Sequence, residues 1–204
     1  MLSEEQIREM VRRVLVQQLG AAGGPAAPSS QTTREEGTAQ PAPAAPRPAA
    51  GGKTLALGSD HGGFELKEKL KPYLYELGWT VDDCGTFSNA AVDYPTLALA
   101  VAQKVGAGQV ARGIMIDGAG IGSCMTANKV PGVRASLCYD PMTARNAREH
   151  NDANVLTLGG QLLGIATARE IVRIWLSTEC KEERHLKRVA LITDIERRFS
   201  GGAR

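Results

Sequence analysis

The 204-residue sequence lacks an excess of charge of one sign, a long apolar stretch and closely spaced cysteines. Its formal net charge of +2 is too small to indicate nucleic acid or an anionic membrane as the main partner. No apolar run approaches the roughly 20 residues of a membrane span, and no secretory apolar segment follows the N-terminus. We therefore expect a cytoplasmic protein with an ordinary globular core.

Cysteine and histidine are both scarce, which argues against a metal centre. No two of the four cysteines form a C-x-x-C pair, which is typical of reduced thiols; they are Cys84, Cys124, Cys138 and Cys180. Each of the three histidines has a polar setting that is typical of a solvated loop; they are His61, His150 and His185. His61 and His150 have no second ligand at the spacing of a metal site, so we expect no metal.

The N-terminal quarter of the chain differs in composition from the rest. Residues 3–19 predict an isolated amphipathic helix, because Ser3 and Gln6 form a capping-box start and apolar residues recur at helical spacing. Residues 20–52 are rich in Ala, Pro and Gly and have almost no large apolar side chain, which predicts a disordered, flexible linker.

A helix on a long tether indicates a docking segment. The pattern of residues 1–19 followed by residues 20–52 resembles the encapsulation peptides that carry enzymes into bacterial microcompartments. The resemblance implies that residues 1–19 bind a shell protein. A mitochondrial presequence is the alternative, and three early acids count against it: Glu4, Glu5 and Glu9.

Strands and helices alternate in the remaining domain, residues 53–204. The predicted strands are 54–58, 79–83, 113–116, 133–138 and 154–158. The predicted helices are 64–77, 93–105, one from about 121, then 141–150, 166–175 and 182–199. This alternation requires right-handed crossovers, so we expect an α/β, Rossmann-like three-layer fold with a five-stranded parallel sheet.

In such a sheet, ligands bind beyond the carboxyl ends of the strands. Asp60 and His61 follow the first strand, and Asp117 follows the third. We expect these three residues at that edge, together with His150, which comes one helix later.

The segment 113–129 contains the strongest candidate for a catalytic site. Its apolar strand ends at Asp117, and glycines follow at every second position: Gly118, Gly120 and Gly122. A strand, a glycine turn and a helix start let backbone N–H groups surround an anion. A carboxylate beside such donors can remove a proton and hold the resulting negative charge. The sequence leaves open the alternative that Asp117 only caps the following helix.

Four motifs occur in order along residues 53–199. They are GSDHGG at 58–63, DGAGIG at 117–122 with ANK at 127–129, REHNDAN at 148–154 and RHLKR at 184–188. Together they resemble the ribose-5-phosphate isomerase B family, which includes the two galactose-6-phosphate isomerase subunits. The resemblance implies a cofactor-free aldose–ketose isomerase and a homodimer or tetramer with active sites between subunits.

The resemblance also implies roles for individual residues. Asp60 and His61 would contact the sugar and its ring oxygen, and His150 would help to open the furanose ring. Backbone amides of the glycine loop would hold the enediolate, from Gly118, Gly120 and Gly122. The remaining substrate contacts would include a phosphate clamp of two arginines, which bind phosphate through parallel hydrogen bonds; these contacts are Ser123, Asn128, Asn151, Arg184 and Arg188.

Four positions depart from the pattern of that family. Asp117 stands where much of the family has a cysteine base, and Ser123 stands where another branch has a glutamate base. Ala119 replaces a Thr or Ser that assists proton transfer, and Gln161 replaces an arginine that binds phosphate. Asp at 117 and Gln at 161 are features of one galactose-6-phosphate isomerase subunit.

These observations predict an isomerase that interconverts ribose 5-phosphate and ribulose 5-phosphate inside a bacterial microcompartment. His150 would open the ring with help from Asp60, and Asp117 would move the proton between C2 and C1. Two alternatives remain. One is an isomerase of a hexose or deoxypentose phosphate, and the other is a non-catalytic sugar-phosphate-binding subunit that needs a partner chain.

Overall fold

The computed structural model describes residues 53–200. The predicted helix of residues 3–19 and the linker of residues 20–52 lie outside the described residues, so both stay predictions. Within residues 53–200, no helix combines the length and the apolar character that crossing a membrane requires.

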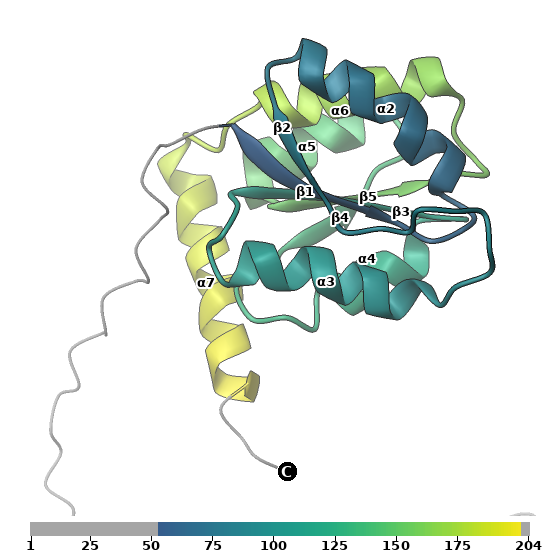
Figure 1. Ribbon diagram of the computed structural model, residues 1–204. Coiled ribbons are helices and arrows are strands. Elements are labelled where there is room, and N and C mark those ends of the chain that lie inside the picture. The colour runs from purple at the N-terminus through teal and green to yellow at the C-terminus, as the bar shows by residue number, and fades with distance from the viewer. Residues whose placement is uncertain (1–52, 201–204) are drawn as a thin grey trace, which may run out of the picture. The chain divides into compact units, whose positions relative to one another are not determined.

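Five parallel strands form one sheet at the centre of the described region, as the sequence predicts (Figure 1). Their order is β2-β1-β3-β5-β4, with bounds β1 Thr54–Ser59, β2 Thr80–Asp83, β3 Arg112–Asp117, β4 Ala135–Leu137 and β5 Val155–Gly159. The three central strands are buried almost throughout, which explains their continuous apolar runs. Strand β4 is shorter than expected, because Val133 closes a turn with Val130.

Helices cover both faces of the sheet and make the predicted three layers. Their bounds are α2 Phe64–Glu76, α3 Tyr94–Gly106, α4 Ile121–Ala127, α5 Pro141–Asn151, α6 Ile165–Ser177 and α7 Glu183–Ser200. Helices α2, α5 and α6 pack on one face, whereas α3 and α4 pack on the other. Helix α7, yellow in Figure 1, buries only His185 among its own residues.

Alternating side chains of the central strands divide the core between the two faces. In β1, Leu55 packs with the α2, α5 and α6 layer, and its neighbour Ala56 packs with α3. Gly58 and Gly113 let α3 lie close to the sheet, since a Cβ on either would lie 2.7 or 2.8 Å from a methyl group of Val101. The glycines therefore set the distance of α3 from the strands that carry the site.

A buried lysine fixes the loop between β2 and α3. Lys67 is fully buried, and its Nζ donates to the Asp83 carboxylate at 2.7 and 2.9 Å and to the Thr86 carbonyl at 2.7 Å. Lys71 also pairs with Asp83, at 2.9 Å. Burial favours a higher pKa for Asp83, but the hydrogen bonds from both lysines outweigh it and lower the pKa below its usual value. The ion pair thus anchors a loop that reaches the carboxyl edge of the sheet.

Strand β1 is the point at which the chain changes direction across the sheet. From β1 the chain passes to β2 on one side and then crosses to β3 on the other. In folds of this kind, the ligand crevice is expected where the strand order reverses, which here is between the carboxyl ends of β1 and β3.

Candidate active site

Three loops meet at the carboxyl ends of β1, β3 and β5. The Asp60 N–H donates to the Ile116 carbonyl at 3.1 Å, which joins the first loop to β3. The Gly160 N–H donates to the Asp117 carbonyl at 2.7 Å, which joins the β3 and β5 loops. Hydrogen bonds between main chains thus hold the crevice together.

Glycines allow these loops to touch. A Cβ at Gly63 would overlap the Ile116 carbonyl, and one at Gly160 would lie 2.6 Å from the Gly62 carbonyl oxygen. A Cβ at Gly62 would lie 3.1 Å from the Gly118 nitrogen. Because a side chain at Gly63 or Gly160 would overlap main-chain atoms, and one at Gly62 would be tight, main-chain atoms build this part of the site, which we call the glycine floor (Gly62, Gly63 and Gly160).

Asp117 lies at the end of β3 and is only 5% exposed. Its Oδ1 accepts hydrogen bonds from the Ala119 N–H, at 2.8 Å, and from the Gly120 N–H. Its Oδ2 accepts a hydrogen bond from the Ser123 N–H at 2.9 Å. The carboxylate therefore holds the glycine loop and the first turn of α4, which is the capping role that the sequence left open.

These bonds change the predicted anion site. The Gly120 N–H already donates to Asp117, so within this chain it is not a free donor for an enediolate, and the predicted role of Gly120 is not supported within one chain. The N–H groups of Gly118 and Gly122 have no acceptor among residues 53–200, and both residues are partly exposed. A carboxylate has about four acceptor positions, so one position remains on Oδ2 of Asp117. The arrangement combines a carboxylate that can accept a proton with two available donors.

Asp60 is the second carboxyl group of the crevice and is 6% exposed. Its Oδ1 accepts a hydrogen bond from the Gly63 N–H at 2.9 Å. Burial raises the pKa of Asp60 above its usual value, and the negative charge of Asp117 adds to the rise, whereas the Gly63 hydrogen bond opposes it. Asp60 thus holds a proton more readily than an exposed aspartate does and is suited to donate one.

His61 lies beside this pair at the mouth of the crevice, as the sequence predicts. Its side chain is exposed, and its Nδ1 lies 3.2 Å from the carbonyl oxygen and 3.3 Å from the nitrogen of Val92. This contact joins the β1 loop to the loop before α3. The Nε2 atom has no partner among residues 53–200, so it can contact a ligand.

Two tyrosines at the site were not predicted from the sequence. The Tyr94 ring covers Gly122 so closely that a Cβ there would lie 2.5 Å from Tyr94 Cζ and 2.6 Å from its hydroxyl. The Tyr139 hydroxyl donates to the Ala119 carbonyl at 2.7 Å. Neither belongs to a spaced motif, because each reaches the glycine loop from a distant part of the chain, so the sequence contains no signal for them.

Two predicted substrate contacts have structural roles here. Ser123 is fully buried, its N–H is bound to Asp117, and its Oγ has no partner in the described region. Asn128 donates from Nδ2 to the carbonyls of Cys124 and Ala135, both at 3.0 Å, and accepts from the Ala135 N–H at 2.9 Å. Asn128 therefore ties the end of α4 to β4, and its prediction as a substrate contact is not supported within one chain.

Four predicted site residues lie at the opposite edge of the sheet: His150, Asn151, Arg184 and Arg188. Helix α5 runs back from the carboxyl end of β4, so it carries His150 to the amino ends of the strands. There Arg134, which precedes β4, donates from Nε to the Asn151 carbonyl at 3.1 Å. Helix α7 stands at this same edge, away from the arrowheads of the strands (Figure 1). The prediction that His150 lies at the carboxyl edge of its own chain is therefore wrong.

At that edge, His150 stacks on His185. The ring centroids are 4.1 Å apart with an interplanar angle of 13°, and Asn146 Nδ2 lies 3.2 Å from His150 Nδ1. His185 is 2% exposed, and neither of its ring nitrogens has a partner among the described residues. Burial lowers the pKa of His185, and His150 and Arg184 lower it further, so the neutral form of the buried ring is favoured. The stack joins the end of α5 to the start of α7.

The histidines, cysteines and acids of residues 53–200 do not gather in any group of three that could hold a metal ion. The polar groups of the crevice are carboxyls, an imidazole and main-chain N–H groups. These groups can transfer protons and stabilise negative charge on a substrate.

A protein-family model described as Ribose/Galactose Isomerase matches residues 55–192. Ribose-5-phosphate isomerase B of Escherichia coli (strain K12) is 44% identical over 146 residues, which cover 72% of this chain and 98% of that protein. The putative sugar phosphate isomerase YwlF of Bacillus subtilis (strain 168) is 44% identical over 143 residues, which cover 70% of this chain and 96% of that protein.

Solved structures of type B ribose-5-phosphate isomerases are also similar to this chain. The structure of Clostridium thermocellum ribose-5-phosphate isomerase B has a TM-score of 0.70 with 45% identity, and the match covers 72% of this chain and 99% of that one. Type B ribose 5-phosphate isomerase from Trypanosoma cruzi has a TM-score of 0.70 with 41% identity, covering 72% and 98%. The matched region contains the sheet and both edges described above.

Proposed function

Because this chain belongs to the ribose/galactose isomerase family, we propose that it interconverts ribose 5-phosphate and ribulose 5-phosphate without a cofactor. The observation that carries the proposal is the pair of buried carboxyl groups, Asp60 and Asp117, beside the glycine floor at the carboxyl ends of β1 and β3. Two acids with different surroundings suit the successive proton transfers of an aldose–ketose isomerisation. The names of the relatives support the choice of substrate.

In the proposed reaction, Asp117 removes the proton from C2 of the open-chain aldose through its remaining acceptor position. Negative charge develops on O1 as the enediolate forms, and the N–H groups of Gly118 and Gly122 are the donors for it. Asp117 then returns the proton to C1, while the proton of the O2 hydroxyl passes to O1, which gives the ketose. Ala119 has no hydroxyl for this second transfer, so Tyr94, which lies over Gly122, is our candidate.

Ring opening precedes this step. Asp60, whose pKa is raised by burial, would donate a proton to the ring oxygen as the C1–O bond breaks. His150 would accept the proton of the O1 hydroxyl. Since His150 lies at the opposite edge of its own chain, it would come from a second copy, and Arg184 and Arg188 of that copy would bind the phosphate.

Helix α7 supports an assembly of this kind. From residue 191 onward it exposes four large apolar side chains, Leu191, Ile192, Ile195 and Phe199. Ile192, Ile195 and Phe199 also line a groove of about 660 Å³ beside β4. An apolar surface of this kind marks a protein interface, and a two-fold dimer would bring the amino edge of one copy to the carboxyl edge of the other.

An assay of the purified chain alone tests the proposal. Ribose 5-phosphate, a deoxypentose 5-phosphate and several hexose 6-phosphates are compared by kcat/KM, with ribose 5-phosphate expected to be highest. A higher value for another sugar would favour an isomerase of that sugar phosphate. Turnover that appears only after a partner chain is added would favour a non-catalytic subunit, an alternative that the three hydrogen bonds on Asp117 keep open.

The sequence of residues 1–52 supports a second part of the proposal, that the enzyme is cargo of a bacterial microcompartment. The amphipathic pattern and the Ala/Pro/Gly-rich tether suit a segment that binds a shell protein. Deleting residues 1–52 should leave kcat and KM unchanged. Fusing them to an unrelated reporter should carry the reporter into shells in a host that makes them.

The apolar face of the predicted helix should determine this binding. Val11→Glu with Leu15→Glu should release the reporter, because each lost apolar contact weakens burial by about 1.5–3 kcal/mol. Arg8→Ala, on the polar face, is the matched control and should have less effect. A reporter that stays outside the shell in its unmodified form would contradict the cargo role.

A further inference from the structure

The turn that follows α5 has an unusual backbone conformation. Asp152 has φ 46° and ψ 42°, and it is the one non-glycine residue with positive φ in residues 53–200. Glycine or asparagine is the usual residue in this left-handed position at the end of a helix. Aspartate also occurs there, at a cost in free energy that its surroundings offset.

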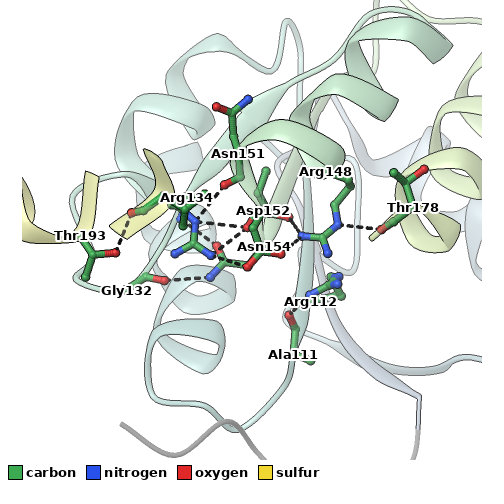
Figure 2. Close-up of polar contacts among 12 residues, drawn as sticks. Ala111, Arg112, Gly132, Arg134, Arg148, Asn151, Asp152, Asn154, Thr178 and Thr193 are labelled. Carbon is green, nitrogen blue, oxygen red and sulfur yellow. Dashed lines mark hydrogen bonds and ion pairs between the residues drawn. The ribbon is translucent and has the colours of Figure 1, made fainter. Parts of the chain in front are cut away.

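Two arginines hold the Asp152 carboxylate, one on each side (Figure 2). Asp152 Oδ1 accepts a hydrogen bond from Arg148 Nη1 at 2.8 Å, and Oδ2 accepts one from Arg134 Nη2 at 3.0 Å. Arg148 is 1% exposed, so its charge is almost fully removed from solvent. Charge-assisted hydrogen bonds in such surroundings are strong and fix geometry.

The same guanidinium groups also bind three consecutive main-chain carbonyls. Arg134 donates to the carbonyls of Asn151 at 3.1 Å and of Asp152 at 2.9 Å. Arg148 Nη1 donates to the Ala153 carbonyl at 2.6 Å. The backbone directly after His150 is therefore held at every residue from 151 to 153.

Arg148 connects this turn to the segment that leads into α7. Its Nε donates to the Thr178 carbonyl at 3.2 Å, and its guanidinium lies 5.6 Å from the centre of the Trp175 ring. Thr178 ends α6, and α7 begins five positions later with Glu183. Arg148 thus links the turn after His150 and Asn151 to the segment that leads into α7, which carries Arg184 and Arg188.

We propose that Asp152, Arg134 and Arg148 form a positioning network that sets the places of His150 and Asn151 in the active site. The inference rests on the proposed function. The main-chain N–H of Asp152 already ends α5 by donating to the Ala147 and Arg148 carbonyls, so the two guanidinium groups are not needed for that purpose. The network lies at the amino edge and acts on the reaction through the residues that it holds.

The first test changes the charge of the network but keeps its size. Asp152→Asn turns an acceptor of two guanidinium groups into a group with an amide donor, so the turn should shift. A displacement of about 1 Å at a catalytic group costs up to about a hundredfold in rate, so we expect kcat to fall at least tenfold. Asp82→Asn, which breaks the surface ion pair of Asp82 with Lys104, is the matched control and should leave kcat unchanged.

Mixed dimers separate positioning from general damage. Asp152→Asn chains are co-expressed with Asp117→Asn chains, and each mixed dimer then contains one site with both halves intact. Random pairing makes half of the dimers mixed, so about one quarter of wild-type activity should return. No return of activity from mixed dimers that are shown to form would overturn the proposal.

A structural readout keeps this test independent of turnover. The NMR signals of the His150 ring nitrogens should shift in Asp152→Asn and stay in place in Asp82→Asn. Unmoved signals together with wild-type kcat would refute the network. Shifted signals in a protein whose wild type isomerises no sugar phosphate would support the network and refute the proposed function instead.

Discussion

At the scale of the residue, Asp117 holds the glycine loop in shape and is also the proposed base. Its carboxylate accepts hydrogen bonds from the N–H groups of Ala119, Gly120 and Ser123. Sulfur is a weak acceptor, so a cysteine at this position would hold the loop less well. The aspartate thus explains how the loop keeps its shape in this chain, and its one remaining acceptor position is what the proposed chemistry depends on.

Asp117→Asn should nearly abolish kcat and also lower stability. The amide cannot take up the proton, and its Nδ2 faces the Ser123 N–H, which loses its acceptor in a buried place. An unsatisfied buried donor costs about 1–3 kcal/mol, so the free energy of unfolding should fall by that amount. Kinetics and denaturant unfolding of the purified variant measure the two effects. A stable variant with wild-type kcat would show that Asp117 is not the base.

His185 should make the folded state sensitive to mild acid. Burial lowers the pKa of His185, and His150, Arg184 and Arg188 lower it further, against a small opposing effect of Glu182. Below about pH 6.5 the unfolded chain therefore binds more protons at this residue than the folded chain does, and stability falls as the pH drops through this range.

His185→Phe removes this titration and keeps a buried ring against His150. The loss of Tm between about pH 7.5 and about pH 5.5 should be smaller in this variant than in the wild type. An equal loss of Tm in both proteins would assign the acid sensitivity to another group.

Residues that come directly after strands were placed correctly from the sequence, whereas His150, near the end of helix α5, was not. Asp60, His61 and Asp117 come directly after buried strands, so the topology alone puts them at the carboxyl edge. Tyr94 was missed because its position over Gly122 depends on how α3 packs, which no local pattern encodes.

At the scale of the element, the alternation of strands and helices was predictable because each segment has a strong period and a clear end. Helix α5 shows that correct prediction of the elements does not by itself place a functional residue at the right edge of the sheet. Its eleven residues, at about 1.5 Å each, carry the chain about 16 Å back across the sheet. A residue at its end therefore belongs to the opposite edge from one at its start, which is why the expected place of His150 was wrong.

The loop between β2 and α3 should depend on Lys67. Lys67→Met keeps the length of the side chain but leaves the Asp83 carboxylate and the Thr86 carbonyl without a buried cation. Removing one partner of a buried ion pair costs roughly 3–5 kcal/mol, and Lys71 still pairs with Asp83, so we expect about 3 kcal/mol. Denaturant unfolding measures the change.

Lys69→Met, on the same helix, is the control, because its pair with Glu65 is exposed and should contribute less than about 1 kcal/mol. The lowered pKa of Asp83 adds a second check. The stability that the Asp83 ion pair contributes is present above the pKa of about 3.9 that an aspartate has in the unfolded chain. It is lost as the pH falls through the lower pKa that Asp83 has in the folded chain. The stability gap between wild type and Lys67→Met should therefore narrow in strong acid, and a constant gap would contradict this account.

At the scale of the whole molecule, each chain holds the proposed base at one edge of its sheet and the proposed ring-opening histidine at the other. The apolar side chains of α7 are then the surface on which function depends. Ile195→Glu should produce a folded monomer without isomerase activity, because a charge in an apolar interface is costly to bury. Light scattering gives the oligomeric state, and circular dichroism verifies the fold.

Tyr75→Glu changes a side chain of similar exposure on α2 and should leave both assembly and activity intact. A variant of Ile195 that stays a dimer and stays active would show that this face of α7 is free in solution.

Evolution of substrate choice in this fold is restricted to the rim of the crevice. Side chains at Gly63 and Gly160 would overlap main-chain atoms of the neighbouring loops, so substitutions there cannot widen, narrow or charge the site without moving the backbone. The rim differs, because its side chains are at least partly exposed and can change size without moving a neighbouring backbone; three of them are His61, Tyr94 and Gln161. A library that randomises these three positions, with the floor left untouched, is the shortest route to enzymes that accept a longer sugar phosphate.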